Sequence, residues 1–259
     1  MKLKKAFLIT VLAFLVILIF YLFAFSQPDY ERFVPATDIL FIFVSLATVI
    51  ITFLTFKVLG WQSREGKVWF FFSLSFFMYF LGEVLWAFYD AILKVNPFPS
   101  FADIFYVGHK VFLITAFLIE LKTIKSTLNK KQIAISALFT IGVAVAIFYL
   151  IIAPIASAAD YDILSKILSL SYPIADIIIL FPVLLSIFVF KGGRISKSWL
   201  VIKISVLTIL AGDAYFSYLD WNELYFGVNM MAADLLWLAS YISFAFGAYY
   251  YKYVMERKK

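Results

Sequence analysis

The 259-residue chain contains no cysteine and only one histidine, His109. Without cysteine there is no disulfide bond, no thiolate nucleophile and no metal site with cysteine ligands. A metal site built from several histidines is excluded too, and no glycine-rich phosphate loop is present. We therefore expect neither a metal ion nor an organic cofactor. Charged residues are also scarce, at 15% of the sequence, where a soluble domain carries roughly a quarter.

Hydrophobic residues make up 64% of the chain and fall in stretches of about twenty, the length that a helix needs to cross ~30 Å of hydrocarbon. The stretches lack the alternation of apolar and polar residues that is typical of membrane β-barrels. We therefore predict an all-α, polytopic membrane helix bundle with about eight transmembrane helices. The expected helices cover residues 6–25, 36–57, 68–92, 101–121, 132–153, 169–190, 198–220 and 229–251.

The first stretch has a second interpretation. It follows three lysines and ends at Ala24-Phe25-Ser26, a pattern that also fits a cleaved signal peptide. Its apolar run of roughly 18 residues exceeds the 7–15 residues of a signal core, which favours a spanning helix.

The connections between the expected helices alternate in charge. One set carries most of the 22 Lys and Arg residues, and the other carries only Arg32, Lys94 and Lys166. By the positive-inside rule, the first set faces the cytoplasm, and this set includes both termini. We therefore expect a multi-pass protein of the plasma membrane. The net charge of +6 then reflects orientation, and we expect no nucleic-acid partner. The basic set comprises Lys2, Lys4, Lys5, Lys57, Arg64, Lys67, Lys122, Lys125, Lys130, Lys131, Lys191, Arg194, Lys197, Lys203, Lys252, Arg257, Lys258 and Lys259.

The two halves of the chain resemble each other at an offset near half its length. The matches occur in the same order and predict two tandem four-helix repeats, residues 1–128 and 129–259, in one membrane domain. Because each repeat has an even number of spans, both run in the same direction and are related by an axis along the membrane normal. The matches are Phe20-Tyr21-Leu22 with Phe148-Tyr149-Leu150, Gly82-Glu83 with Gly212-Asp213, Ala102-Asp103 with Ala233-Asp234, and Pro35 to Asp38 with Pro173 to Asp176.

Ionisable residues inside the expected spans are the main candidates for function, because each costs about 2.5–3.5 kcal/mol to insert. Many duplicated positions are acidic, and helical spacing places aromatic residues on the same faces. A rise of ~1.5 Å per residue puts them all in the outer half of the membrane. We predict an outward-facing acidic and aromatic cavity that binds a small ligand. Its expected residues are Asp38, Glu83, Trp86, Asp103, Tyr106, Lys110, Asp176, Asp213, Asp234, Trp237 and Tyr241.

Structural roles are an alternative for these residues. Four acids come early in their expected helices, where a carboxylate caps free N–H groups. Glu83 and Asp213 are mid-helix, and we expect Lys110 to pair with Glu83, either as a structural ion pair or within a ligand site. The second half has Tyr241 in place of Lys110, so Asp213 is expected to lack a cation. The early acids are Asp38, Asp103, Asp176 and Asp234.

His109 and the aromatic residues carry the same ambiguity. A lone histidine inside a membrane helix is either a hydrogen-bonded packing residue or part of a site. The aromatic residues form either a box for a cation or a packing surface.

Two stretches carry a family resemblance. The first, Gly82-Glu83-Val-Leu-Trp86-Ala-Phe-Tyr89 followed by Pro97-Phe-Pro99-Ser100-Phe-Ala102-Asp103-Ile-Phe-Tyr106, resembles the polytopic sensor region that precedes GGDEF, EAL and histidine kinase domains in microbes. Its later portion is similar to Gly212-Asp213 and to Asp234-Leu-Leu-Trp237. The resemblance implies a non-enzymatic input module for signal transduction. No kinase or cyclase sequence is present, so we expect a separate signalling protein as partner, besides membrane lipids and the ligand.

Two alternative functions stay open. Gly82-Glu83, His109 and Asp213 loosely resemble the pattern of eight-helix lysoplasmalogenases, which implies a lipid hydrolase with these residues as catalytic groups. Such chemistry needs two carboxyl groups that face one reacting bond. The parallel repeat and the intramembrane acids are also typical of a proton- or cation-coupled transporter.

Overall fold

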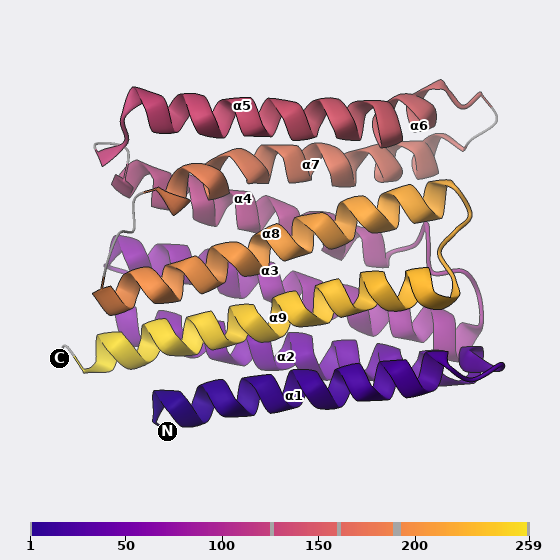
Figure 1. The fold of residues 1–259 in the computed structure, drawn as a ribbon, viewed down its shortest axis with the longest axis horizontal. Helices are drawn as coiled ribbons and strands as arrows, with labels where there is room; N and C mark the ends of the chain where they lie inside the picture. Colours follow the sequence, from indigo (N-terminus) through magenta and orange to yellow (C-terminus); the bar gives the residue numbers. More distant parts are fainter. Residues whose placement is uncertain (1, 125–126, 160–161, 189–192, 258–259) are drawn as a thin grey trace.

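The computed structural model describes residues 2–124, 127–159, 162–188 and 193–257. Among them, eight helices are long and apolar enough to cross a membrane, which confirms the predicted class of multi-pass helical membrane protein. The helices lie roughly side by side, and the two termini lie at the same end of the bundle (Figure 1). We call this the terminal end and the opposite one the distal end. The predicted basic residues Lys125, Lys191, Lys258 and Lys259 lie outside the described residues.

The helices run α1 (Leu3–Phe25), α2 (Val34–Leu59), α3 (Arg64–Ala87), α4 (Ala102–Ile124), α5 (Lys130–Ile147), α6 (Ala153–Ser157), α7 (Ile163–Ile187), α8 (Gly193–Trp221) and α9 (Gly227–Glu256). A short 3₁₀ turn, η1 (Tyr30–Phe33), precedes α2. The π-helical segment η2 (Phe88–Leu93) extends α3, and η4 (Phe148–Ile152) joins α5 to α6. The span predicted at 132–153 is therefore one longer helical stretch, Lys130–Ser157, with a π-helical segment inside it.

Side-chain caps set several helix starts. The hydroxyl of Ser63 accepts a hydrogen bond from the Gly66 amide at the start of α3, and Asn129 forms a reciprocal capping box with Gln132 at α5. Asp162 accepts from two amides at the start of α7, and these hydrogen bonds lower the pKa of its carboxyl group. The predicted start at residue 169 is therefore wrong by about two turns. Pro173 lies inside α7.

Six helices form a closed ring. Each contacts the next in the order α2, α3, α4, α7, α8 and α9, and α9 contacts α2 again. The two remaining spans lie outside this ring, α1 against α9 and α5 against α7. The most apolar windows of both outer spans are only 17% buried, so they present most of their surface to lipid.

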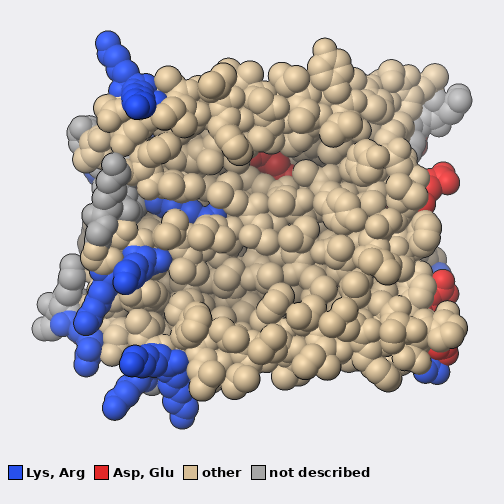
Figure 2. All heavy atoms as spheres, in the orientation of Figure 1, with Lys and Arg blue, Asp and Glu red and all other residues tan. Residues whose placement is uncertain are grey.

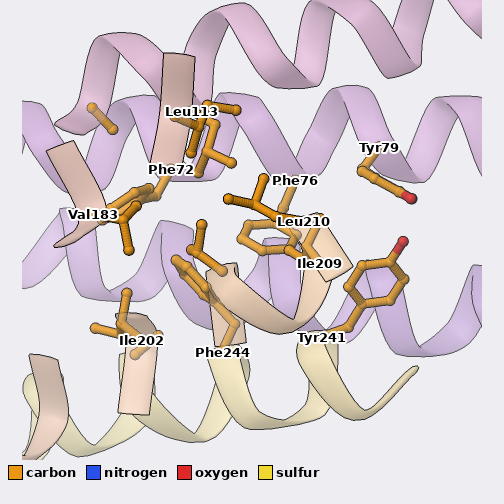
Figure 3. Close-up of a cluster of buried hydrophobic side chains, with 14 of the residues drawn as sticks. Phe72, Phe76, Tyr79, Leu113, Val183, Ile202, Ile209, Leu210, Tyr241 and Phe244 are labelled. Atoms are coloured by element: carbon orange, nitrogen blue, oxygen red, sulfur yellow. The ribbon is translucent and has the colours of Figure 1, made fainter. Parts of the chain in front are cut away.

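Large apolar side chains fill the centre of the ring (Figure 3). We call this set the apolar plug: Phe72, Phe76, Leu113, Val183, Ile202, Ile209, Leu210 and Phe244. Its members come from α3, α4, α7, α8 and α9 and are almost completely buried. The hydroxyl groups of Tyr79 and Tyr241 lie beyond one side of it, toward the polar part of the bundle. The plug therefore separates the distal half of the ring interior from the terminal end.

Charge is unevenly distributed over the surface. Lys and Arg side chains gather at the terminal end, and acidic side chains appear at the distal end (Figure 2). One basic residue departs from the prediction, because Lys203 is not in a connection but inside α8, with 1% of its side chain exposed. It lies 3.9 Å from the Glu120 carboxylate and donates to the carbonyl oxygen of Ser186. The helix begins earlier than expected, at Gly193, which places Lys203 well inside it.

Candidate functional site

A cavity of about 80 Å³ lies in the distal half of the ring. Such a volume holds a few water molecules or one small polar ligand. All six ring helices line it, as do the distal connections around Phe98 and Tyr225. Its walls are Asp38, Phe41, Tyr79, Glu83, Trp86, Phe98, Asp103, Tyr106, Lys110, Tyr172, Asp213, Phe216, Ser217, Tyr225, Met230, Asp234 and Trp237, among which only Tyr172 comes from α7.

Lys110 is the centre of the first polar cluster. Its ammonium group, on α4, donates to Asp176 on α7 and to Asp213 on α8. The second oxygen of Asp213 accepts from the Trp237 indole at 2.7 Å. All three charged side chains are at least nine-tenths buried. The cluster is a buried lysine held between two carboxylates.

This arrangement corrects two predictions. Lys110 pairs with Asp176 and Asp213 and not with Glu83, and Asp213 does have a cation. Glu83 and Asp213 lie at similar expected depths, so depth alone could not choose between them. The ring decides, because α4 lies between α3 and α7 and the lysine crosses toward the α7 and α8 side. Asp176 is also not a capping residue, because α7 begins thirteen residues earlier, at Ile163.

Glu83 and Asp38 form the second polar cluster. The hydroxyl of Tyr241 approaches Glu83 Oε1 at 3.4 Å, which is a long hydrogen bond. Asp38 Oδ2 is buried and has no hydrogen-bond partner within the part of the chain that the structure describes. The two carboxyl groups are near enough for their charges to interact, and Asp90 lies near Asp38. This cluster carries acids without a protein cation among the described residues.

The last two acids are bound by tyrosine hydroxyls. Asp103 accepts from Tyr172 and from the Ser100 amide at 2.7 Å, which agrees with its predicted capping role. Asp234 accepts from Tyr21 at 3.2 Å and from Tyr225 at 3.0 Å, and it caps no helix.

Tyr225 lies in the connection between α8 and α9, outside the spanning segments. Burial, followed by the charge of Asp234, raises the pKa of the Tyr225 hydroxyl well above its usual value. The phenol therefore stays a proton donor to this carboxyl group.

His109 is a packing residue in this structure. It is fully buried, and its Nδ1 lies 2.8 Å from Ser75 Oγ and 3.1 Å from the Ser75 carbonyl oxygen. Its ring packs edge-on against Tyr79 at 4.6 Å between centroids. It does not line the cavity.

No protein-family model, curated protein or solved structure matches this chain. The site is therefore interpreted from its own geometry. Within the described ranges, no group of three or more His, Asp or Glu side chains is arranged to hold a metal ion.

The structure brings the predicted site residues together. Asp176 and Tyr241 do not line the cavity themselves but bond to Lys110 and Glu83, which do. The other predicted residues line it directly: Asp38, Glu83, Trp86, Asp103, Tyr106, Lys110, Asp213, Asp234 and Trp237.

Three tyrosines of the wall were not predicted from the sequence. Two of them, Tyr79 and Tyr172, each lie four residues before an acid of the site, Glu83 and Asp176 respectively, and so share its helix face. That spacing was a usable signal. No such spacing identifies Phe98, Tyr225 and Met230. They reach the cavity from the distal connections and from the start of α9.

Proposed function

We propose that this protein is an integral membrane sensing module that binds a small ligand in its distal cavity and signals through a separate partner. One observation carries the proposal. The cavity lies inside the ring, reaches the distal connections at Phe98 and Tyr225, and is closed toward the terminal end by the apolar plug. A pocket with one accessible side suits binding. The charge distribution in Figure 2 supports an orientation with both termini in the cytoplasm and the cavity facing outward.

The ring also supports two tandem repeats of the same topology. Trp69 contacts Trp199 at 6.2 Å between rings, and Trp86 contacts Phe216 at 6.5 Å. In each pair the two positions are 130 residues apart, and equivalent residues of two repeats touch only near the axis that relates them. The ring order α2, α3, α4 is followed by α7, α8, α9, as such an axis requires. The outer spans α1 and α5 do not follow it, because they pack on α9 and α7.

The geometry favours binding over the two alternatives. A hydrolase of the expected kind needs Glu83 and Asp213 free to act on one bond, but both oxygens of Asp213 are bonded to protein groups. His109 is not in the cavity. A transporter needs a polar route to the terminal end, and the plug fills that route with buried aromatic and aliphatic side chains.

A cavity-filling variant tests ligand binding. Ser217 lines the cavity, and we expect Ser217→Trp to fill it, whereas Leu138→Trp adds the same side chain at a 74% exposed position of α5. Thermal midpoints in nanodiscs are measured with small amines, alcohols and carboxylates. At least one class is expected to raise the midpoint of wild type and Leu138→Trp but not that of Ser217→Trp. Equal shifts in all three proteins, or no shift in any, would contradict the proposal.

Two further measurements separate sensing from the other activities. Ligand is expected to change amide hydrogen exchange in the parts of the ring helices that lie at the terminal end of the bundle. An unchanged exchange pattern would support ligand binding but contradict a role in signalling. For the hydrolase alternative, lysophospholipid turnover is compared between wild type and Glu83→Gln. Turnover that the variant abolishes would favour the enzyme over the sensor.

A further inference from the structure

The acids of the cavity differ in how well the protein satisfies them. Asp103 and Asp234 accept from tyrosine hydroxyls, and Asp176 and Asp213 share the ammonium group of Lys110. The two that remain are Asp38 and Glu83.

Asp38 and Glu83 are buried without matching partners. Each keeps less than a tenth of its surface exposed, at 7% and 8%. Asp38 Oδ2 has no partner among the described residues, and the side chain that approaches Asp38 is another acid, Asp90. Glu83 meets only phenols, through the long contact with Tyr241 and a contact with Tyr106. Both side chains line the cavity. Buried carboxyl groups are normally paired or hydrogen-bonded, so this pair lacks a donor.

The other half of the chain contains the corresponding pair with its donor in place. Glu83 corresponds to Asp213 and Asp38 to Asp176 in the two matching segments. The donors, Lys110 and Tyr241, also occupy corresponding positions. Lys110 of the first half bonds to Asp213 of the second half. Tyr241 of the second half approaches Glu83 of the first half. One acid pair therefore meets an ammonium group. The other meets phenols, from Tyr241 and Tyr106, that contact only Glu83.

We propose that Asp38 and Glu83 bind the ammonium group of a small protonated amine, as Asp176 and Asp213 hold that of Lys110. The inference rests on the proposed function of the cavity as a ligand site and names the class of its ligand. An ammonium group has three N–H donors and a positive charge, which are what this pair lacks.

The rest of the cavity suits such a ligand. Aromatic rings stand beside the two acids, with Trp86 one turn beyond Glu83 and Phe41 one turn beyond Asp38, and a ring face attracts a cation. Lys110 does not repel a second cation strongly, because two carboxylates neutralise it. A volume of about 80 Å³ restricts the ligand to a compact monoamine.

Calorimetric titration of the nanodisc-embedded protein tests the inference at constant ionic strength. The probes are methylamine and ethylamine, their neutral analogues methanol and ethanol, and sodium chloride. We expect an amine to bind and its neutral analogue not to bind. Asp38→Asn and Glu83→Gln are each expected to weaken amine binding by at least about ten-fold, because each removes a charge-assisted hydrogen bond. The matched control Asp220→Asn, an acid of α8 outside this cavity, should stay within about two-fold of wild type.

A relocated lysine gives the sharpest test. Tyr241→Lys places an ammonium group at the position equivalent to Lys110, so we expect it to occupy the acid pair, raise the thermal midpoint without ligand and abolish amine binding. Amine binding that survives in folded Tyr241→Lys would overturn the inference. If that variant does not fold, unchanged amine binding in Asp38→Asn and Glu83→Gln overturns it equally.

The outcomes separate this inference from the proposed function. A neutral or anionic compound that binds in the cavity while no amine does would remove the ammonium assignment and leave the sensing module in place. Binding of sodium with amine-like dependence on Asp38 and Glu83 would replace the amine by an inorganic cation. If no compound of any class binds, both proposals fail together.

Discussion

In the proposed two-repeat arrangement, the two halves of the chain bring equivalent residues to the cavity and differ in one donor. In each half a glycine of the third helix packs against an aromatic ring of the fourth, Gly82 against Tyr106 and Gly212 against Trp237. In each case the acid after the glycine meets a donor from the fourth helix of the other half. That donor is Lys110 in one case and Tyr241 in the other. The difference teaches that one side of the cavity has an internal cation, and it is the basis of our proposal that the other side binds an external one.

Removal of the internal cation is expected to have the largest effect. Lys110→Met leaves Asp176 and Asp213 buried without a positive charge. We expect the free energy of unfolding to fall by about 3–5 kcal/mol, which is typical when one partner of a buried ion pair is lost. Steric trapping in bicelles measures this quantity.

A neutral version of the same cluster is the control. Lys110→Met combined with Asp176→Asn and Asp213→Asn removes all three charges, and most of the lost stability should return. If the triple variant is less stable than Lys110→Met alone, unpaired charge is not the cause of the loss.

The paired glycines test whether the halves share one packing geometry. A Cβ atom at Gly82 would lie 2.6 Å from the Tyr106 ring, and one at Gly212 would lie 2.9 Å from the Trp237 indole nitrogen. We expect Gly82→Ala and Gly212→Ala each to cost about 1–3 kcal/mol of unfolding free energy, because the added methyl group would overlap the ring and force it to shift. At Gly142 no atom lies within 4 Å, so Gly142→Ala should be neutral or slightly stabilising. Sensitivity at only one of the paired glycines would contradict a shared geometry.

The tyrosines that satisfy Asp103 and Asp234 should have smaller and similar effects. Tyr172→Phe leaves Asp103 with the Ser100 amide, and Tyr21→Phe leaves Asp234 with Tyr225. Because each acid keeps one donor, we expect each variant to lose about 1.5 kcal/mol in unfolding free energy. A loss as large as that of Lys110→Met would mean that the remaining donor does not satisfy the acid.

The smallest effect is expected from removal of the Tyr241 hydroxyl group. Tyr241→Phe removes only a 3.4 Å contact with Glu83, so the unfolding free energy should change by less than about 1 kcal/mol. A clearly larger loss would show that the phenol satisfies Glu83 well, which would remove the contrast between the halves. The same melting or trapping assay serves for all these variants.

The helices and the charged residues that line the cavity could be predicted from the sequence for a simple reason. Crossing a membrane fixes the length and apolar character of each span, and buried charges are rare enough to be noticed individually. The depth of Glu83, Lys110 and Asp213 also follows from the helical rise. These quantities are properties of single helices.

The partners of these residues depend on how helices pack side by side, which depth does not determine. Glu83 and Asp213 both lie at a depth similar to that of Lys110. Only the position of α4 beside α7 determines that Lys110 pairs with Asp176 and Asp213. Asp176 was placed too near a helix start because the expected helix began at residue 169, whereas α7 begins at Ile163 after the Asp162 cap. Lys203 was assigned to a connection, although its stable position depends on Glu120 and Ser186 of neighbouring helices.

The closed ring has a consequence for biosynthesis. Lys110 is made 66 residues before Asp176 and 103 residues before Asp213, and the ring closes only when α9 reaches α2. During translation the first four spans therefore enter the bilayer with a lysine and several carboxyl groups that have no final partners. Such groups are expensive in lipid, so the nascent first half has to remain near water or the insertion machinery until the later spans arrive. The second half thus completes the folding of the first.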